Sequence, residues 1–306
     1  MQPMLATRGT AVPTGEEWTH EVKWDGVRIL ADVRDGGCRL FSRNGNDVTV
    51  AWPEVATGHG VRDLLVDGEL IALNDRGLPD FRMLQDRIHQ RNRTKIENLA
   101  RAVPASYMVF DLLRLDGQDL TQLPLTTRRQ KLQEVGLDGR WQAPDSYDDG
   151  AMLWQATREQ RLEGVVSKRR NSTYQFGVRS RDWIKLPHRE RGSYVVGGWR
   201  PQEGTTDRLA SLLVGELGPG GLLYRGRVGS GIGPKQSRAL AELVAGLDRA
   251  ESPFADEVPR VDAQGTHWLE PTLVVDIDTH GRGYERLRQP SFQGVRTDVT
   301  PEDLLS

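Results

Sequence analysis

The segment Glu21-Val22-Lys23-Trp24-Asp25-Gly26-Val27-Arg28 combines residue types that could carry out nucleotidyl transfer. A lysine acts as a nucleophile only after its amine loses a proton, which burial and neighbouring cations favour by lowering the pKa. Asp25 could hold a divalent cation beside that amine, Gly26 permits close backbone approach, and Arg28 could meet a phosphate. These parts suit attack on the α-phosphate of a nucleotide. Taken alone, the segment also fits an exposed lysine near a strand turn.

Further segments with suitable chemistry follow in order along the chain. Their key residues are a second cation, two acids beside glycines, an aromatic that could stack on a base, and a lysine between apolar residues: Arg43, Glu69, Glu163, Phe110 and Lys185. Arg296-Thr297-Asp298 lies near the end of the sequence. Each segment has an ordinary reading as core, turn or solvated surface. Their common order and workable spacing favour one nucleotide-processing site.

The elements that must position these residues alternate strands and helices in the first two-thirds of the chain. A hairpin turn is expected at residues 35–37, and residues 186–192 form a polar, aperiodic stretch that predicts a linker. Strands are predicted at 19–22, 27–33, 39–41, 64–73, 105–113, 164–168, 194–199, 211–216, 222–228 and 272–277, and helices at 81–102, 127–135, 149–161 and 234–247. Several strands and one helix after the linker fit a small Greek-key barrel of the OB type.

Composition restricts the class of protein and its compartment. The 306 residues carry a formal net charge of −2, with no apolar run long enough to span a membrane and no secretory start. The single cysteine, Cys38, suits a reducing cytoplasm. Two local basic runs, at 82–101 and 168–191, are either solvated faces or contacts for a polyanion such as DNA or RNA.

In the order of these motifs the chain resembles the covalent nucleotidyltransferases, which comprise DNA ligases, RNA ligases and messenger-RNA capping enzymes. Within them it looks like an ATP-dependent DNA ligase of the bacterial repair type, for end joining or excision repair. The most particular similarities lie at residues 4–6, 81–89, 195–199 and 290–298. The resemblance implies an α+β fold, with a nucleotidyltransferase (adenylation) domain of antiparallel sheets and flanking helices at 1–188. An OB-fold β-barrel domain would follow at 189–306.

The resemblance also implies a role for each motif residue. Lys23 would become adenylated by ATP with release of pyrophosphate, giving a lysyl-AMP adduct, and Mg²⁺ or Mn²⁺ would assist. The other implied contacts are Glu21 with the adenine amine, Phe110 with the adenine face, Glu69 with the ribose, Arg28, Arg179 and Lys185 with phosphates, Arg43 with the nick phosphate, and Asp25 and Glu163 with the metal. AMP would then pass to a 5′-phosphate, and a 3′-hydroxyl would attack and expel AMP.

The implied substrate is nicked double-stranded DNA. By analogy, a Ku-like end-binding protein or a repair polymerase would be a partner of this monomer in the bacterial cytoplasm, associated with the nucleoid. Family members swing the barrel between two poses, which places a hinge in the linker. An RNA ligase, a capping enzyme that takes GTP, and a catalytically decayed OB nucleic-acid-binding protein remain as alternatives.

Two positions depart from the family pattern. Relatives usually carry a lysine where this chain has Pro187 and a basic residue where it has Val299. Both positions chiefly serve the handling of ATP phosphates, so slower self-adenylation than in typical relatives is expected.

Overall fold

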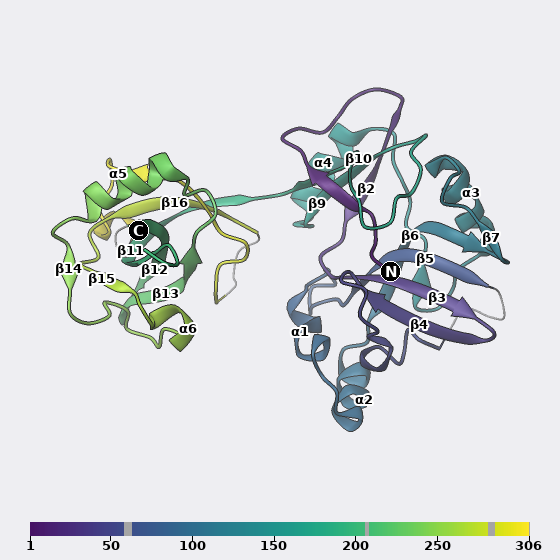
Figure 1. The fold of residues 1–306 in the computed structure, drawn as a ribbon, viewed down its shortest axis with the longest axis horizontal. Coiled ribbons are helices and arrows are strands. Elements are labelled where there is room, and N and C mark those ends of the chain that lie inside the picture. Colours follow the sequence, from purple (N-terminus) through teal and green to yellow (C-terminus); the bar gives the residue numbers. More distant parts are fainter. Residues whose placement is uncertain (58–62, 206–207, 281–284, 306) are drawn as a thin grey trace. The chain divides into compact units, whose positions relative to one another are not determined.

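Two sheets form the framework of residues 1–187 (Figure 1). The computed structural model describes residues 1–57, 63–205, 208–280 and 285–305. The first sheet has the order β4 (Gly37–Ser42), β3 (Val27–Arg34), β5 (Leu64–Ile71), β6 (Ser106–Leu115) and β7 (Gln118–Asp119), with β8 (Trp141–Gln142) beside β6. The second has the order β1 (Leu5–Arg8), β10 (Arg179–Pro187), β9 (Gly164–Arg169) and β2 (Trp18–Lys23). Their pairings are antiparallel except β1–β10 and β6–β8.

Buried side chains join the two sheets and attach the helices. Met4, Phe110 and Trp183 belong to a cluster shared by the two sheets, which unites chain segments far apart in sequence. A larger core on the first sheet includes Leu84 of α1 (Arg82–Ile88) and Leu132 of α3 (Leu125–Val135). Helix α4 (Gly150–Glu159) packs instead on β2 and β9 of the second sheet.

The predicted helix at 81–102 is wrong in one respect, because the segment forms two helices. Helix α1 ends at Ile88, and α2 spans Arg93–Ala102. The Asn92 side chain accepts a hydrogen bond from the Lys95 N–H at 3.0 Å and so caps a new helix. The Gln90 side-chain oxygen accepts from the N–H groups of Arg91 and Asn92, which occupies the backbone between the helices.

Residues 188–306 form a second unit around a curved sheet. Strands β13 (Gly221–Val228), β12 (Leu209–Gly218), β11 (Glu190–Pro201), β15 (His267–Leu269) and β14 (Asp248–Arg249) follow one another, and β16 (Val274–Thr279) joins β11 to β17 (Ser291–Arg296). Helix α5 (Pro234–Val244) packs on β12; it begins with proline at its first turn, where a missing N–H costs nothing. The short elements are α6 (Arg260–Ala263), η1 (Thr49–Ala51) and η2 (Glu302–Leu305). The predicted α+β class is confirmed.

The predicted polar linker at 186–192 is largely strand. Strand β10 continues to Pro187 and β11 begins at Glu190, which leaves only His188 and Arg189 between them. The polar residues after the break pair with β16, where Arg191 lies opposite Asp278 and its guanidinium Nε is 2.9 Å from the carboxylate. The chain forms two compact units, Met1–Pro187 and His188–Ser306. The domains expected from the sequence span 1–188 and 189–306.

Candidate active site

Sheet register places the nucleophile candidate in a row of polar residues on one face of the second sheet. Lys23 on β2 lies opposite Gly164 on β9, and Gly164 lies opposite Pro187 on β10. The next row on that face joins Glu21, Val166 and Lys185. Directly opposed residues of antiparallel strands project to the same side, so Glu21, Lys23 and Lys185 share one face.

Lys23 is paired with Glu163 in this structure. The lysine Nζ lies 2.5 Å from Glu163 Oε2, and the two side chains are 20% and 15% exposed. Two glycines near this pair allow the backbone segments to pack closely against one another. A Cβ on Gly26 would lie 1.9 Å from the Leu70 carbonyl oxygen, and Gly164 has a φ of +143°. Both positions therefore exclude other residues for steric and conformational reasons.

Cations gather near the Lys23–Glu163 pair. The pKa of Lys185 is lowered, first by desolvation and then by the positive charges of Lys23, Arg179 and Arg43. Arg179 also donates to the Ala6 carbonyl at 2.7 Å, which fixes its position beside β1. The structure thus brings together the predicted nucleophile and three of the cations predicted to contact phosphates. Such a concentration of positive charge suits a polyphosphate ligand.

A second group lies next to the nucleophile, around the buried carboxylate of Glu21. Lys168 Nζ is 2.6 Å from Glu21 Oε2 and 4.3 Å from the ring centroids of both Phe110 and Trp183. The other oxygen, Glu21 Oε1, has no hydrogen-bond partner among the described residues, and the Arg129 Nε lies 3.9 Å away. A buried carboxylate oxygen without a donor is costly, so it is suited to accept from a ligand N–H. An adenine amine would supply that donor.

Phe110 borders this group but exposes only 7% of its surface. The Arg28 guanidinium carbon lies 4.5 Å from the ring centroid, and Trp183 meets the ring edge-on at 6.2 Å. Stacking of Phe110 on adenine stays a prediction.

Arg28 is engaged by a buried network in this structure. Its Nε and Nη2 donate to the two Asp67 oxygens at 2.6 and 2.7 Å, and Nη2 also donates to the Met4 carbonyl at 3.3 Å. The Tyr174 hydroxyl donates to Asp67 at 2.5 Å, so Asp67 holds both groups. The Asp67 charge raises the pKa of Arg28. A phosphate contact by Arg28 would have to use the guanidinium edge that this network leaves.

The remaining predicted acids are Glu69, which interacts electrostatically with Lys23, and Asp25, which follows Lys23 closely in sequence. Desolvation raises the pKa of Glu69 to about 8, against the opposing charges of Arg28 and Lys23, while Glu163 adds repulsion. A protonated Glu69 can donate a hydrogen bond, as contact with a ribose hydroxyl allows. Asp25 Oδ2 accepts from the Phe81 N–H at 3.3 Å, at the start of α1.

Several residues of this site were not predicted. Lys168 and Arg129 contact Glu21, while Asp67 and Tyr174 hold Arg28. Lys168 follows Glu163 closely in sequence and Asp67 lies just before Glu69, so closeness to the predicted acids is the available signal. For Arg129 and Tyr174 there was no local signal, because only the tertiary fold brings them to the site.

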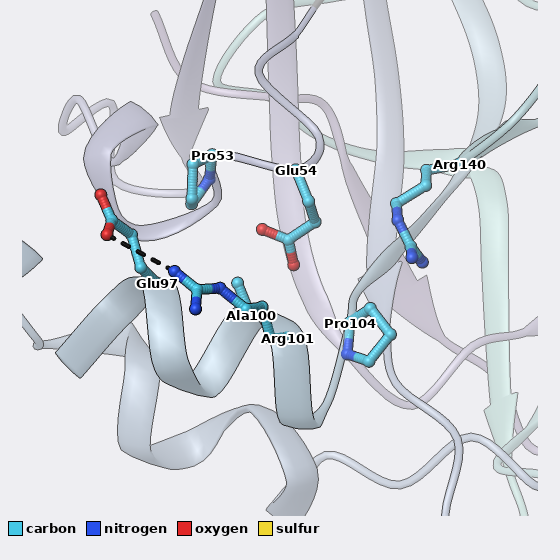
Figure 2. Close-up of a pocket in the computed structure, with 7 residues that line it drawn as sticks. All are labelled: Pro53, Glu54, Glu97, Ala100, Arg101, Pro104 and Arg140. Atoms are coloured by element: carbon cyan, nitrogen blue, oxygen red, sulfur yellow. Dashed lines mark ion pairs between the residues drawn. The ribbon is translucent and has the colours of Figure 1, made fainter. Parts of the chain in front are cut away.

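A surface cavity of about 400 Å³ lies elsewhere in the first unit (Figure 2). Figure 2 shows the Arg101 and Glu97 side chains of α2 extending toward each other across its rim. None of the predicted site residues lines it; the lining residues are Pro53, Glu54, Glu97, Ala100, Arg101, Pro104 and Arg140. The cavity therefore adds nothing to the nucleotide site.

No cluster of three or more histidine, cysteine, aspartate or glutamate residues with metal-binding geometry occurs in the described ranges. Mg²⁺ needs none, since it commonly binds one or two carboxylates together with substrate phosphates and water. Glu163 and Asp25 are carboxylates of the required kind near Lys23 in space or sequence. The donor set fits a hard cation shared with a nucleotide.

In the second unit, Arg296 is held by acids. Its guanidinium donates to both oxygens of Asp298 at 2.7 Å and lies 3.6 Å from Asp276. Val299 follows directly in sequence, without the usual basic side chain.

Comparisons with known proteins match the whole chain to one family. The model described as ATP dependent DNA ligase domain matches residues 3–186, and that described as ATP dependent DNA ligase C terminal region matches 205–299. A "Multifunctional non-homologous end joining protein LigD" from Mycolicibacterium smegmatis is 36% identical, with 99% of this chain and 39% of the relative covered. One from Pseudomonas aeruginosa is 32% identical, with 97% and 35% covered. The chain thus spans less than half the length of these curated relatives.

Solved structures agree with this match. The ligase domain from M. tuberculosis LigD is 35% identical with a TM-score of 0.57, over 100% of this chain and 98% of that one. A structure of mycobacterial DNA ligase D complexed with ATP and MES is 35% identical with a TM-score of 0.57, over 99% of this chain and 97% of that one. A Lig E DNA ligase, 18% identical with a TM-score of 0.64 over 97% and 99%, shares the fold. Within the described residues, no helix has the length and apolar character to cross a membrane.

Proposed function

The chain belongs to the ATP-dependent DNA ligase family, and we propose that it seals 5′-phosphate/3′-hydroxyl nicks in double-stranded DNA through an adenylate on Lys23. The family membership confirms the resemblance read from the motifs, and with it the use of ATP and a divalent metal. The matches do not favour an RNA ligase, a capping enzyme or a decayed binding protein.

One observation supports the site most directly. Lys23 lies beside Glu163 on the sheet face that also carries Lys185 and the partner-deficient carboxylate of Glu21. A nucleotide whose base meets Glu21 would bring its phosphates toward Lys23 and Lys185. Lys23 lies two residues further along β2 on the same face, and Lys185 lies on β10 in the same row as Glu21, with β9 between them. Holding the reacting amine and phosphate together supplies much of the rate of such a transfer.

We assign each residue of the site a role in binding the nucleotide or the nick. Glu21 accepts from the adenine amine while Lys168 keeps the carboxylate in place, and Phe110 borders the base. Glu69 contacts the ribose. The cations Arg28, Lys185, Arg179 and Arg43 meet phosphates, the last at the nick.

A metal held by Asp25 and Glu163 would neutralise phosphate charge. For Lys23 to attack, its amine must leave the ion pair with Glu163, and a cation bound at that carboxylate would favour this release.

The cellular context is an inference from the relatives. The names of these relatives describe non-homologous end joining, which supports broken or nicked DNA as substrate and a role in end-joining repair. A Ku-like protein or a repair polymerase would hold the ends. We further infer action as a monomer near the bacterial nucleoid.

The decisive experiment is sealing of an end-labelled nicked duplex with ATP and Mg²⁺, with Lys23→Ala and Lys23→Arg beside the wild type. Wild type should seal and both variants should lose sealing and the AMP adduct together, because neither side chain replaces the nucleophile. An AMP adduct on Lys23→Ala would show that another residue is the nucleophile. Absence of sealing by the wild type, with an adduct present, would redirect the substrate to RNA.

A further inference from the structure

An exposed apolar projection lies in the connection between β9, which carries Lys168, and β10, which carries Lys185. Residues 170–178 form this connection, and near its end Phe176 is 39% exposed and Val178 is 43% exposed. Single exposed apolar side chains are ordinary on protein surfaces. This pair is unusual because the loop is fixed and because cations adjoin it.

Backbone contacts fix the loop against the first residues of the chain. The Gly177 N–H donates to the Gln2 carbonyl at 2.9 Å, and the Leu5 N–H donates to the Val178 carbonyl at 2.8 Å. The Phe176 ring also meets the buried Tyr174 ring edge-on, with centroids 5.1 Å apart. The projection is therefore held in place, so ordering it on binding would cost little conformational entropy.

The surroundings of Phe176 identify the occupant by its chemistry. Arg179 directly follows the loop as the first residue of β10, and both Arg179 and Arg43 are close enough to Lys185 to act on its charge. Met1, half exposed, packs on the turn that carries Arg43, because a Cβ on Gly45 would lie 3.1 Å from the Met1 carbonyl. Apolar rings beside phosphate-binding cations characterise surfaces that bind nucleic acid by stacking.

We propose that Phe176, flanked by Val178, contacts the exposed base or sugar of the nucleotide at the nick while Arg43 and Arg179 hold the adjoining phosphates. The proposal rests on the proposed ligase function. At a nick the backbone is interrupted, so a base step separates more readily than in intact duplex, and apolar side chains exploit such steps. The contact would therefore favour nicked DNA over intact duplex.

The test measures binding of the full chain to a nicked duplex and to an intact duplex of the same sequence, without ATP and in EDTA so that no turnover occurs. Phe176→Ala should weaken binding to the nicked duplex by about tenfold and leave binding to intact duplex nearly unchanged. Phe176→Trp should retain the preference, since a ring is kept. The matched control is Met152→Ala, another exposed apolar residue, on α4, which should behave as wild type.

A photocrosslinker gives a second reading. With 5-iododeoxyuridine beside the nick, we expect the crosslinked peptide to contain Phe176. AMP adduct formation by Phe176→Ala without DNA shows whether the variant is folded. Equal affinities of wild type and a folded Phe176→Ala for the nicked duplex would overturn the proposal. A wild type that prefers nicked DNA but forms no adduct and seals nothing would instead refute the proposed function.

Discussion

At the scale of single residues, the site combines groups that were visible in sequence with groups that only the fold supplies. Lys23 is predicted because Asp25 and Gly26 follow it closely, and Glu163 because a glycine follows it before a predicted strand, while the role of Glu21 is implied by the family resemblance. Lys168 holds Glu21 at 2.6 Å only because β2 and β9 pair in one register, with Thr19 opposite Lys168. A single sequence does not state strand register, so this ion pair could not be predicted.

Replacing Lys168 should weaken the use of ATP in adduct formation more than replacing an exposed lysine does. In Lys168→Met, the buried Glu21 would lose its close partner and keep only Arg129 at 3.9 Å. A charge-assisted contact contributes about 1.5–3 kcal/mol, so the ATP concentration for half-maximal adduct formation should rise about tenfold or more. Adduct formation at varied ATP, without DNA, measures this. Lys95→Met on exposed α2 is the control, and an unchanged ATP dependence in Lys168→Met would remove the lysine from the site.

At the scale of elements, strands were predicted more accurately than helix ends and connections. Strand β5 was located because its apolar residues continue on both sides of Asp67 and Glu69. The helix at 81–102 is predicted from the apolar spacing of Phe81, Leu84 and Ile88, all of which lie before the break, and residues 89–95 continue no apolar period. Capping by Asn92, a local side-chain contact, begins the second helix.

Helix α1 is anchored by a buried ion pair whose loss should destabilise the first unit. Arg87, 1% exposed, donates to both Glu54 oxygens at 2.7 Å and to the Ala51 carbonyl, and its guanidinium lies over the Trp52 ring. Arg87→Met leaves Glu54 as an uncompensated, mostly buried charge, so unfolding free energy should fall by about 3–5 kcal/mol. Urea denaturation measures the change.

The same experiment contains its own controls. Arg93→Met breaks the exposed pair with Glu97 and should cost at most about 1 kcal/mol. Arg87→Met with Glu54→Gln should be more stable than Arg87→Met alone, because the unpaired charge is gone while an acceptor for the Ala105 N–H remains. Equal losses in Arg87→Met and Arg93→Met would contradict the anchoring role.

At the scale of the whole molecule, each unit has its own apolar core, and the residues that depart from the family pattern are divided between them. Pro187 ends β10 in the first unit, opposite Gly164 and in the same row as Lys23. Val299 follows Arg296 and Asp298 in the second unit. The order of motifs was readable in sequence because it is a property of the chain. The end of the polar linker could not be predicted from the sequence, because Arg191 becomes a strand residue only through pairing with β16.

Restoring both cations should speed self-adenylation. A lysine at 187 would project from the face that carries Lys185, two residues earlier on the same strand, and would add positive charge beside Lys23. Val299→Lys would restore the basic side chain of the family pattern next to Asp298, which together with Asp276 engages Arg296. One charge-assisted contact is worth about 1.5–3 kcal/mol, so Pro187→Lys with Val299→Lys should raise the single-turnover rate of adduct formation by about tenfold. Sealing of a nick that already carries AMP should change less, because ATP phosphates are absent from that step. An adenylation rate equal to that of the wild type would mean that Pro187 and Val299 do not limit this enzyme, and the existing cations Lys185, Arg179 and Arg43 would then suffice for the phosphates.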